Sequence, residues 1–207
     1  MARDIQPIVK LSRREGYALH PKAHKALVKR SSPPGQQGGG GRNRRTKSSQ
    51  YSLQLREKQK VKRLYGLLER QFAKLMNEAT RTKGQSGEAL LQFLERRLDN
   101  VVYRAGFASS RRAARQLVTH GHFMLNGRRI DIPSIRVVTG DTITLRGHSQ
   151  KTDYFKRLDD VSPVPPEIPT WLKVNRKQVS ISVSGLPSRD NAEPDIKEQL
   201  IIEYYSR

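Results

Sequence analysis

The sequence predicts an α+β protein, in which a helical N-terminal domain precedes a domain of two helices packed on a small antiparallel β-sheet. Apolar residues recur at three- and four-residue steps between residues 53 and 104, which is the period of helices. After residue 121 the apolar period changes to two, and an Asn-Gly pair separates two short apolar runs. The helices therefore come first, and the strands are grouped after them.

The charge of the chain is strongly positive and unevenly distributed. Its 207 residues include 40 Lys and Arg against 19 Asp and Glu, a formal net charge of +21. Residues 1–63 hold 17 of these cations and 3 of the acids, so two thirds of the excess lies in under a third of the chain. A charge of this size predicts a polyanionic partner, with nucleic acid as the first candidate.

Several other classes of protein do not fit the composition. No apolar run approaches the roughly 18 residues of a membrane helix, and the N-terminus lacks the apolar core of a signal peptide, which favours a cytoplasmic setting. Cysteine is absent, which excludes disulfides and cysteine-ligated zinc. His20 and His24 have the spacing of two ligands on one helix face, but Pro21 separates them and no further ligand is near. We therefore predict no metal site, no cofactor, no membrane partner and no small-molecule substrate.

A basic extension of about 50 residues begins the chain. Its segment 31–49, SSPPGQQGGGGRNRRTKSS, combines Pro-Pro, four consecutive Gly and several cations. Alone this segment cannot bury enough surface to offset its backbone entropy. A solvated linker and an extension that becomes ordered on an anionic partner both fit, and the density of positive charge favours the second.

Two helices are expected after the extension. The first covers residues 53–81, where apolar residues at helical spacing indicate a buried face and the cations fall mostly on the remainder. The turn KGQSG (83–87) ends this helix. The second covers about 87–104, and Gly106 closes it.

The stretch SSRRAARQLVTHGHFMLNGRRI (109–130) predicts a third helix and a hairpin. Ser109 or Ser110 is a good N-cap, and Gly121 is expected directly after the last helical turn. Asn126-Gly127 is the strongest two-residue hairpin signal, because both positions of the favoured turn need positive φ.

Three more strands and a last helix complete the expected order. Residues 142–145 alternate as a strand, and 171–174 and 179–183 read as two more. The segment 148–169 is polar and then proline-rich, and 195–205 fits a short helix.

The arginines at the start of the third helix have the wrong sign for its dipole. Arg111 and Arg112 lie at the positive N-terminal end, where each costs a few tenths of a kcal/mol when no anion is bound. A phosphate reverses the sign, because free N–H groups, the helix dipole and the guanidinium groups then act on one anion. We expect Arg115 to join them on the exposed face, so that replacing all three leaves folding intact, and we expect Arg128 and Arg129 of the hairpin nearby. Arginines that are merely solvated are the alternative.

The motifs in this order resemble a known RNA-binding family. SSRRAARQLV, HGHFMLNGRRIDIPSIRVVTGD and TITLRG, with ERRLDNVVYRAGFA before them, resemble the module called the S-four domain. LSRREG (11–16), PGQQG (34–38), YSLQLREKQKVKRLYGLLERQF (51–72), PTWLKV (169–174) and EQLIIEYYSR are similar to bacterial small-subunit ribosomal protein number four. Many relatives hold zinc through cysteines, and the family motif PGQHG is PGQQG here.

This resemblance implies a structural constituent of the small ribosomal subunit and no enzyme. It implies a primary rRNA-binding protein that binds the 5′ domain of small-subunit (16S-type) rRNA, nucleates subunit assembly and contributes to translational accuracy. It implies the third and fifth small-subunit proteins as neighbours, with mRNA near the point where it enters the subunit. The expected location is the small ribosomal subunit in the cytoplasm, and an organellar ribosome is left open.

Residues expected to contact RNA come from several parts of the chain. The resemblance implies this role for positions near residues 13, 51–63 and 111–116, and the charge pattern adds cations of the extension and the hairpin. They are Arg13, Arg14, Arg42, Arg44, Arg45, Lys47, Tyr51, Arg56, Lys58, Lys60, Lys62, Arg63, Arg111, Arg112, Arg115, Gln116, Arg128 and Arg129.

The domain boundaries follow from these elements. Residues 1–50 are the extension, and residues 51–91 form a helical domain that the C-terminal segment 195–207 completes. Residues 92–194 form the RNA-binding domain, with the S-four module at 92–147.

Two other classes of protein that carry an S-four module are the alternatives to a ribosomal protein. An RNA-modifying enzyme needs a catalytic site, but Asp99 and Asp141 lie in the module's own helix and turn, where solvated or capping roles are expected. About 60 residues follow the module, too few for a catalytic domain. A free stress factor that recognises stalled large subunits would lack the N-terminal helical region and the PTWLKV and IIEYY segments.

Overall fold

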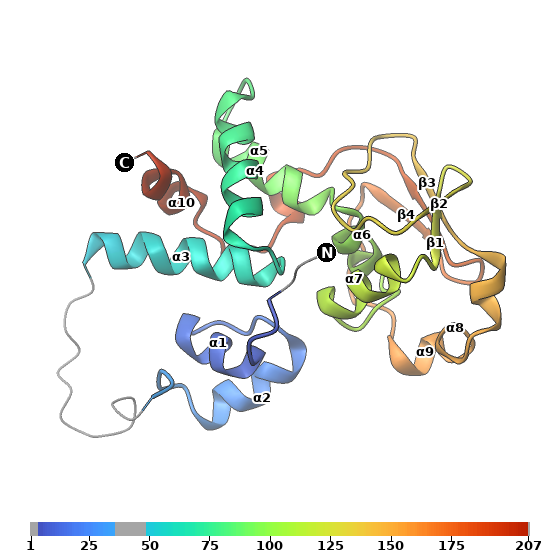
Figure 1. Cartoon of the computed structure of the whole chain (residues 1–207), viewed down its shortest axis with the longest axis horizontal. Coiled ribbons are helices and arrows are strands. Elements are labelled where there is room, and N and C mark those ends of the chain that lie inside the picture. Colours follow the sequence, from blue (N-terminus) through green and yellow to red (C-terminus); the bar gives the residue numbers. More distant parts are fainter. Residues whose placement is uncertain (1–3, 36–48, 207) are drawn as a thin grey trace. The chain divides into compact units, whose positions relative to one another are not determined.

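The computed structural model describes residues 4–35 and 49–206. They fall into two compact units (Figure 1): the described residues up to Ala89 with those from Asp195 onward, and Leu90–Pro194. Within the described part of the chain, no helix is long and apolar enough to cross a membrane.

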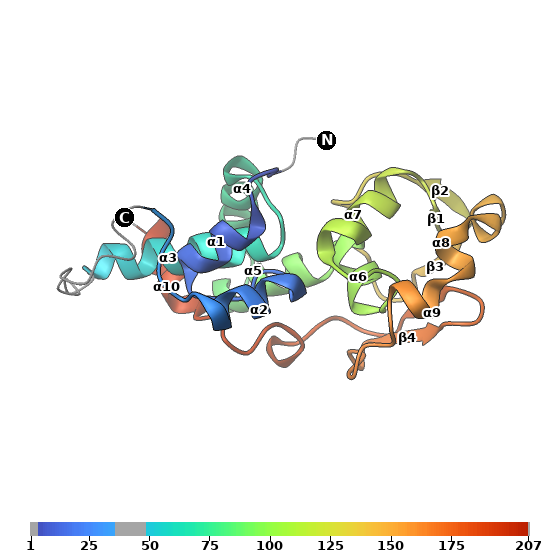
Figure 2. The same ribbon diagram turned by 90° about the horizontal axis from the view of Figure 1, so that it is seen from below.

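The first unit is helical. Its helices are α1 (Ile8–Glu15), α2 (Pro21–Lys29), α3 (Gln50–Leu64), α4 (Glu69–Arg81), the start of α5 (Ser86–Glu95) and α10 (Glu198–Tyr205). The C-terminal helix α10 packs along α3 (Figure 2), and the rings of Tyr51 and Tyr204 lie 5.8 Å apart. The last described segment of the chain is thereby part of the helical unit.

Helices α1 and α2 lie in the segment where the sequence predicted only a basic extension. Ile8, Leu11, Leu19 and Ala23 are buried between them and their neighbours. The hydroxyl of Ser12 donates to Ile8 O at 2.8 Å and accepts from Leu19 N at 3.3 Å, which fixes the turn between the helices. A few well-spaced apolar residues are therefore enough to order this segment, although its composition is polar.

The prediction of one helix over 53–81 was wrong, because the chain breaks between α3 and α4. Gly66 has φ +65°, a left-handed conformation that favours glycine, and its N–H donates to Arg63 O. Leu67 N then donates to Lys62 O at 2.9 Å, which closes α3 before α4 begins. The apolar spacing continues across the break, which is why periodicity alone did not reveal it.

The predicted helix over 87–104 is also interrupted, between α5 and α6 (Leu98–Arg104). Arg97 adopts an extended conformation and forms an isolated bridge with Arg136. Val137 N donates to Arg96 O and Leu98 N donates to Ile135 O, so the segment 135–137 satisfies the backbone at the break.

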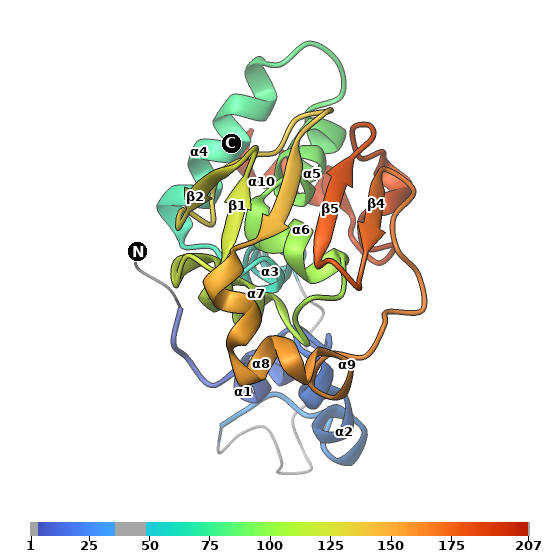
Figure 3. The same cartoon turned by 90° about the vertical axis from the view of Figure 1, so that its right-hand side faces the viewer.

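The second unit packs two helices against one face of an antiparallel sheet (Figure 3). Helices α6 and α7 (Arg111–Thr119) precede β1 (Phe123–Leu125), β2 (Arg128–Ile130), β3 (Thr142–Leu145), β4 (Leu172–Asn175) and β5 (Ser180–Val183). The strand order is β2-β1-β3-β5-β4, with every neighbouring pair antiparallel. Val102, Phe107, Phe123, Ile143 and Ile181 are fully buried at the centre of the core between helices and sheet.

The hairpin has the predicted turn. Asn126 and Gly127 both have positive φ, +50° and +78°, as the favoured two-residue turn requires. The Asn126 amide donates to Asp141 Oδ1 at 2.8 Å, and its oxygen accepts from Thr142 N at 2.9 Å. The turn is thereby fastened to the start of β3.

Short helices occupy the polar, proline-rich segment where none was predicted. They are η2 (Gly147–Lys151), α8 (Asp153–Lys156) and α9 (Leu158–Val161), and η3 (Arg189–Asn191) follows β5. Phe155 and Leu158 are buried in the core. The Ser162 hydroxyl donates to Gly106 O at 2.9 Å, which ties the end of this segment to the turn after α6.

Replacing Leu117 by Ala should lower the free energy of unfolding by about 2–5 kcal/mol, because Leu117 is buried in the core of the second unit. The neighbouring Gln116→Ala should change it by less than about 0.5 kcal/mol, because that side chain is exposed. Urea unfolding followed by the fluorescence of Trp171 measures both. Equal effects of the two substitutions would contradict the placement of α7.

Candidate RNA-binding surface

Arg111 begins α7 and is held by groups of its own unit. Ser110 caps the helix, its hydroxyl accepting from Ala113 N at 3.2 Å. The Arg111 guanidinium donates to Asn100 Oδ1 and to Glu193 Oε1, both at 2.9 Å. It lies 4.6 Å from the centre of the Tyr103 ring. The conformation of Arg111 is therefore set before any partner arrives.

Glu193 explains how the chain tolerates cations at this helix end. Its carboxylate pairs with Arg111 at 2.9 Å and with Arg104 at 3.5 Å. Burial raises the pKa of Glu193, but the charges of Arg111 and Arg104 outweigh burial and hold this pKa below its ordinary value. The carboxylate thus partly offsets the unfavourable charge at the positive end of the helix.

The expectation that Arg115 is exposed was wrong. Its side chain is buried, and its guanidinium donates to Asp99 Oδ2 at 3.3 Å. Asp99 also accepts two hydrogen bonds from Arg97, at 3.0 and 3.1 Å, so one buried carboxylate holds two arginines. The partner acid lies sixteen residues away on α6, which helical spacing within α7 does not reveal.

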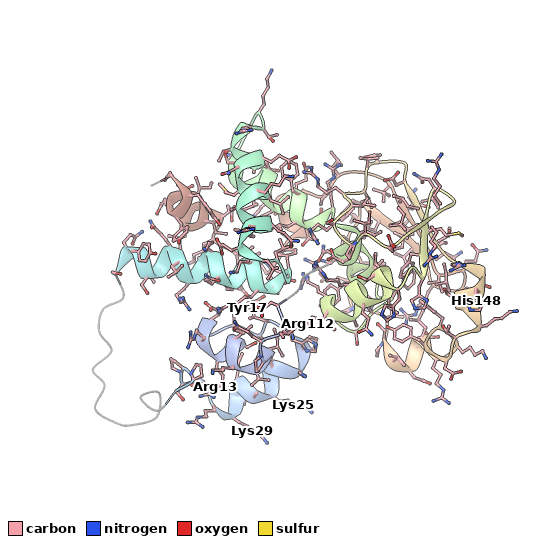
Figure 4. The ribbon with its side chains drawn as sticks, in the orientation of Figure 1. Arg13, Tyr17, Lys25, Lys29, Arg112 and His148 are labelled. Atoms are coloured by element: carbon pink, nitrogen blue, oxygen red, sulfur yellow. The ribbon has the colours of Figure 1, made fainter. Side chains whose placement is uncertain are left out.

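Four residues of the predicted set remain on the exposed side of this unit. Arg112 and Gln116 are exposed on α7 (Arg112 is labelled in Figure 4), and Arg128 and Arg129 are exposed on β2. The Arg129 guanidinium lies over Gly121, where an added Cβ would come within 2.7 Å of its Nε. The side chain of Arg129 therefore reaches the residue that follows α7 and His120, whereas a common RNA-binding role for α7 and the hairpin stays a prediction.

Two histidines, His120 and His122, follow α7 and were not singled out from the sequence. The rings of His120 and His122 lie 6.1 Å apart, and His122 Nδ1 is 3.0 Å from the Ser149 hydroxyl. Burial, with the nearby charges of His120 and Arg146, lowers the pKa of His122. His148 is exposed on η2 (Figure 4). The period-two pattern of this segment was used to predict a strand from its apolar residues, and it gave no role to the histidines.

Asp99 and Asp141 have structural roles. Asp99 accepts from Arg97, Arg115 and Asn100 N, and Asp141 accepts from Asn126 and from Val138 N at 2.8 Å. Each carboxylate is fully engaged in holding a helix start or a turn. Of the two roles expected from the sequence, solvated or capping, the solvated one does not fit, because both carboxylates are buried.

In the first unit a single buried carboxylate gathers arginines from α1 and α3. Glu15 accepts hydrogen bonds from Arg56, at 3.1 Å, and from Arg63. Arg14, its neighbour in α1, is exposed. Burial raises the pKa of Glu15 even against the charges of Arg56, Arg63 and Arg14. The group is therefore a preformed cluster of three arginines around one carboxylate.

The three lysines of α3 are engaged within the unit, and the expectation that Lys58 lies off the buried stripe was wrong. Lys58 is buried, donates to Glu69 at 2.7 Å and lies 4.6 Å from the centre of the Tyr204 ring. Lys62 donates to the same carboxylate at 3.0 Å. Lys60 donates to Asp195 O at 2.8 Å. Lys58 therefore acts within the core of this unit.

The remaining predicted residues have different surroundings. Arg13 donates to Ser32 O at 3.0 Å, which ties α1 to the segment after α2, and Tyr51 is exposed at the start of α3. The cations Arg42, Arg44, Arg45 and Lys47 lie outside the described residues.

Helix α2 presents a basic face that was not assigned from the sequence. Lys22, Lys25 and Lys29 are exposed at steps of three and four residues, and Arg30 follows them (Lys25 and Lys29 are labelled in Figure 4). Only two acids, Asp4 and Glu15, occur between residues 4 and 35. Helical spacing of these lysines was the available signal.

The two histidines weighed as zinc ligands lie in α2 and directly before it. His20 caps the helix, because its Nδ1 accepts from Lys22 N at 3.1 Å, and His24 is exposed. Across residues 4–35 and 49–206, no group of three or more His, Asp or Glu is arranged to hold a metal ion.

The fold and the basic surface define an RNA-binding protein built on an S4 domain. Residues 96–143 match the family described as S4 domain, and residues 3–95 match the Ribosomal protein S4/S9 N-terminal domain. The "Small ribosomal subunit protein uS4" of Chloroflexus aurantiacus is 51% identical over 208 residues, with all of both chains covered. Those of Roseiflexus castenholzii and Herpetosiphon aurantiacus are 50% and 51% identical, again over all of both chains. The chain belongs to the small ribosomal subunit protein uS4 family, whose members are structural proteins and not enzymes.

Replacing Arg115 by Ala should lower the free energy of unfolding by about 1–3 kcal/mol, because Asp99 then loses one of its buried partners. The matched Arg112→Ala should change it by less than about 0.5 kcal/mol, because Arg112 is exposed. Chemical denaturation of the two variants tests this difference. An Arg115→Ala variant as stable as the unmodified chain would restore the original expectation of an exposed arginine.

Glu69 gives a pH-dependent prediction. Burial opposes its ionisation, but hydrogen bonds from Lys58, Lys62 and Tyr205 outweigh burial and lower its pKa to about 2 from 4.5. Its contribution to stability is therefore present above about pH 4.5 and is lost as the pH falls toward 2. Glu69→Gln should lower the free energy of unfolding at pH 7, and the difference from the unmodified chain should shrink toward pH 3.

The control for this measurement is Glu88→Gln, which removes an exposed carboxylate that forms no ion pair with a described residue. Denaturant titrations at each pH compare the two variants. A Glu69→Gln deficit that stayed constant from pH 7 to pH 3 would show that the ion pairs of Glu69 do not stabilise the fold.

Proposed function

We propose that this chain binds small-subunit rRNA as a structural component of the small ribosomal subunit. The observation that carries the proposal is identity of about half over the whole length with proteins named small ribosomal subunit protein uS4. The exposed basic surface of the second unit and the arginine cluster around Glu15 support it, because both suit a polyanionic partner.

The mechanism is neutralisation of phosphates by preformed cations. In the second unit, Arg112, Gln116, Arg128 and Arg129 meet the RNA, and Arg111 supports them from the start of α7. Since Arg115 is buried on Asp99, its role is to hold α6 and α7 together. Binding releases counterions from the RNA, so affinity falls as salt rises.

In the first unit, the clustered arginines and the face of α2 supply the contacts. Arg14, Arg56 and Arg63 surround Glu15, and Lys22, Lys25 and Lys29 follow one side of α2. Tyr51 adds an exposed ring, and the extension cations Arg42, Arg44, Arg45 and Lys47 complete the contact. Lys58, Lys60, Lys62 and Arg13 support this surface from within the unit.

The specific partners of the chain within the subunit are proposed from the family resemblance. We propose the 5′ domain of the rRNA as the binding site, with the chain nucleating subunit assembly. The third and fifth small-subunit proteins are its neighbours, mRNA passes nearby, and the chain influences accuracy of decoding. The bacterial sources of the relatives favour a cytoplasmic ribosome.

The two compact units also suggest how the chain is divided into domains. We propose that residues 51–91 and the C-terminal segment 195–207 fold as one helical domain, preceded by the extension 1–50, with residues 92–194 as the RNA-binding domain. The packing of α10 on α3 supports this division.

Sedimentation of the tagged chain from a cell lysate in magnesium buffer, followed by a high-salt wash, tests the function directly. We expect stoichiometric retention on small subunits, because a primary rRNA contact is buried under later assembly. Migration with large subunits or as free protein would contradict the proposal, and the first of these would favour the stress-factor alternative.

Salt dependence tests the mechanism. Affinity for in-vitro transcribed small-subunit rRNA should fall steeply between low and physiological salt, and the double variant Arg112→Ala/Arg128→Ala should reduce the log–log slope by about two. The control Lys177→Ala/Lys156→Ala removes the same charge from exposed positions of this unit that lie outside the proposed surface. Equal slopes for the two double variants would contradict the assignment of Arg112 and Arg128.

A further inference from the structure

The sheet of the second unit has a second face, opposite its core, that is lined by small polar side chains. Side chains at paired positions of antiparallel strands lie on the same face, so the register defines it. One row runs through Met124, Thr144, Ser180 and Asn175 with Arg129 at its edge, and the next runs through Thr142, Ser182 and Lys173. We call these eight residues the hydroxyl face.

Four hydroxyl groups occupy the middle of this face. Thr142 and Ser182 are directly opposite each other on β3 and β5, as are Thr144 and Ser180. None of the four side chains makes a hydrogen bond to any residue that the structure describes. Each hydroxyl therefore retains both its donor and its acceptor for a partner outside the unit.

The charges on the hydroxyl face all have one sign. Arg129 lies on the edge strand β2 and Lys173 on the opposite edge strand β4, and both side chains are exposed. Neither forms an ion pair with a carboxylate of the described residues. No acidic residue belongs to either row. The face therefore presents cations at its two edges and small hydrogen-bonding groups between them.

No helix of this unit covers the face. Figure 3 shows the five strands in front of α6 and α7, with η2 and α8 beside one end of the strands. Thr142, Ser182, Lys173 and Asn175 are exposed. An antiparallel sheet can simply face water on one side, so exposure alone would carry no conclusion. Two further observations indicate that the face binds a partner, namely its unpaired hydroxyls and its uniformly positive charge.

We propose that the hydroxyl face is a second RNA-docking surface of this unit, which receives the sugar–phosphate backbone of a folded rRNA segment. Ser and Thr hydroxyls and cations are the groups that commonly contact phosphate and ribose. Small side chains let the backbone of an RNA helix approach the sheet closely, and recognition through 2′-OH and phosphate groups needs no base readout. This inference rests on the proposed rRNA binding and extends the contact from the hairpin across β3, β5 and β4.

A protein partner fits this face less well. Stable protein interfaces are enriched in aromatic side chains and Met at their centres, whereas the hydroxyl face has only the partly buried Met124. Arg129 belongs both to this face and to the surface near Gly121, so the two surfaces meet at β2. One continuous RNA segment can therefore contact both.

Opposite charges at one exposed position test the proposal. Ser182→Glu should weaken binding of in-vitro transcribed small-subunit rRNA about tenfold, and Ser182→Lys should leave it unchanged or strengthen it. Both substitutions add a longer side chain at the same position of β5, so they differ mainly in charge. Gln85→Glu, in the turn before α5, is the control that adds the same negative charge elsewhere and should have little effect.

Two results would overturn the inference while rRNA binding by the unmodified chain persists. Unchanged affinity for both Ser182 variants would mean that the face is only solvated, and equal weakening by both would indicate a close-packed partner other than a phosphate backbone. Failure of the unmodified chain to bind the rRNA would overturn the proposed function and this inference together. Circular dichroism and urea unfolding of each variant identify any loss of folding.

The absence of cysteine allows a direct proximity measurement. Ser182→Cys provides a unique thiol for tethered Fe(II)-EDTA, whose hydroxyl radicals cut nearby RNA backbone. We expect discrete cuts in the rRNA from this position and different or no cuts from Gln85→Cys. An Fe(II)-EDTA complex that binds rRNA but gives no cuts from position 182 would overturn the docking surface.

Discussion

The pairing of a few carboxylates with several cations each is the interaction on which both units depend. A chain with 40 cations and 19 acids cannot neutralise its charges one by one, and several of its acids each pair with two cations. Where such a pair is buried, breaking it is costly, because it leaves a charge without compensation in a poorly solvated site. The shared carboxylates are Glu15 with Arg56 and Arg63, Glu69 with Lys58 and Lys62, Asp99 with Arg97 and Arg115, and Glu193 with Arg104 and Arg111.

This sharing also prepares the protein for a polyanion. An arginine held by a neighbouring carboxylate has already lost much of its rotamer freedom, so less entropy is lost when a phosphate binds it. Glu15, Glu69 and Asp99 each pair with two cations, which leaves these three clusters with net positive charge. Around Glu193 the charges balance, because Arg104 also pairs with Glu95 at 2.9 Å. Glu15 is the clearest case, since its carboxylate is buried while the side chain of Arg56 is 38% exposed. The same contacts thus stabilise the fold and orient the binding groups.

Local rules in the sequence predicted the second unit well and the first less completely. Asn126-Gly127, Ser110 and Gly121 each act within a few residues, so turn chemistry and capping placed them correctly. The breaks at Gly66 and Arg97 were missed because the apolar period continues through them. The burial of Arg115 and Lys58 was missed because their partners come from other elements, Asp99 on α6 and Glu69 on α4. An ion pair between two helices cannot be predicted from the spacing of residues within either helix.

The hydroxyl face is also a feature that the sequence alone did not reveal. Thr142, Thr144, Ser180 and Ser182 look like ordinary polar strand positions when β3 and β5 are read separately, nearly forty residues apart in sequence. Only the register brings them together and shows that no acid accompanies them. A strand face that faced water alone would have no reason to exclude carboxylates, whereas one that receives a phosphate backbone would be weakened by each of them. The selection of side chains on this face is therefore better explained by a polyanionic partner than by solvent.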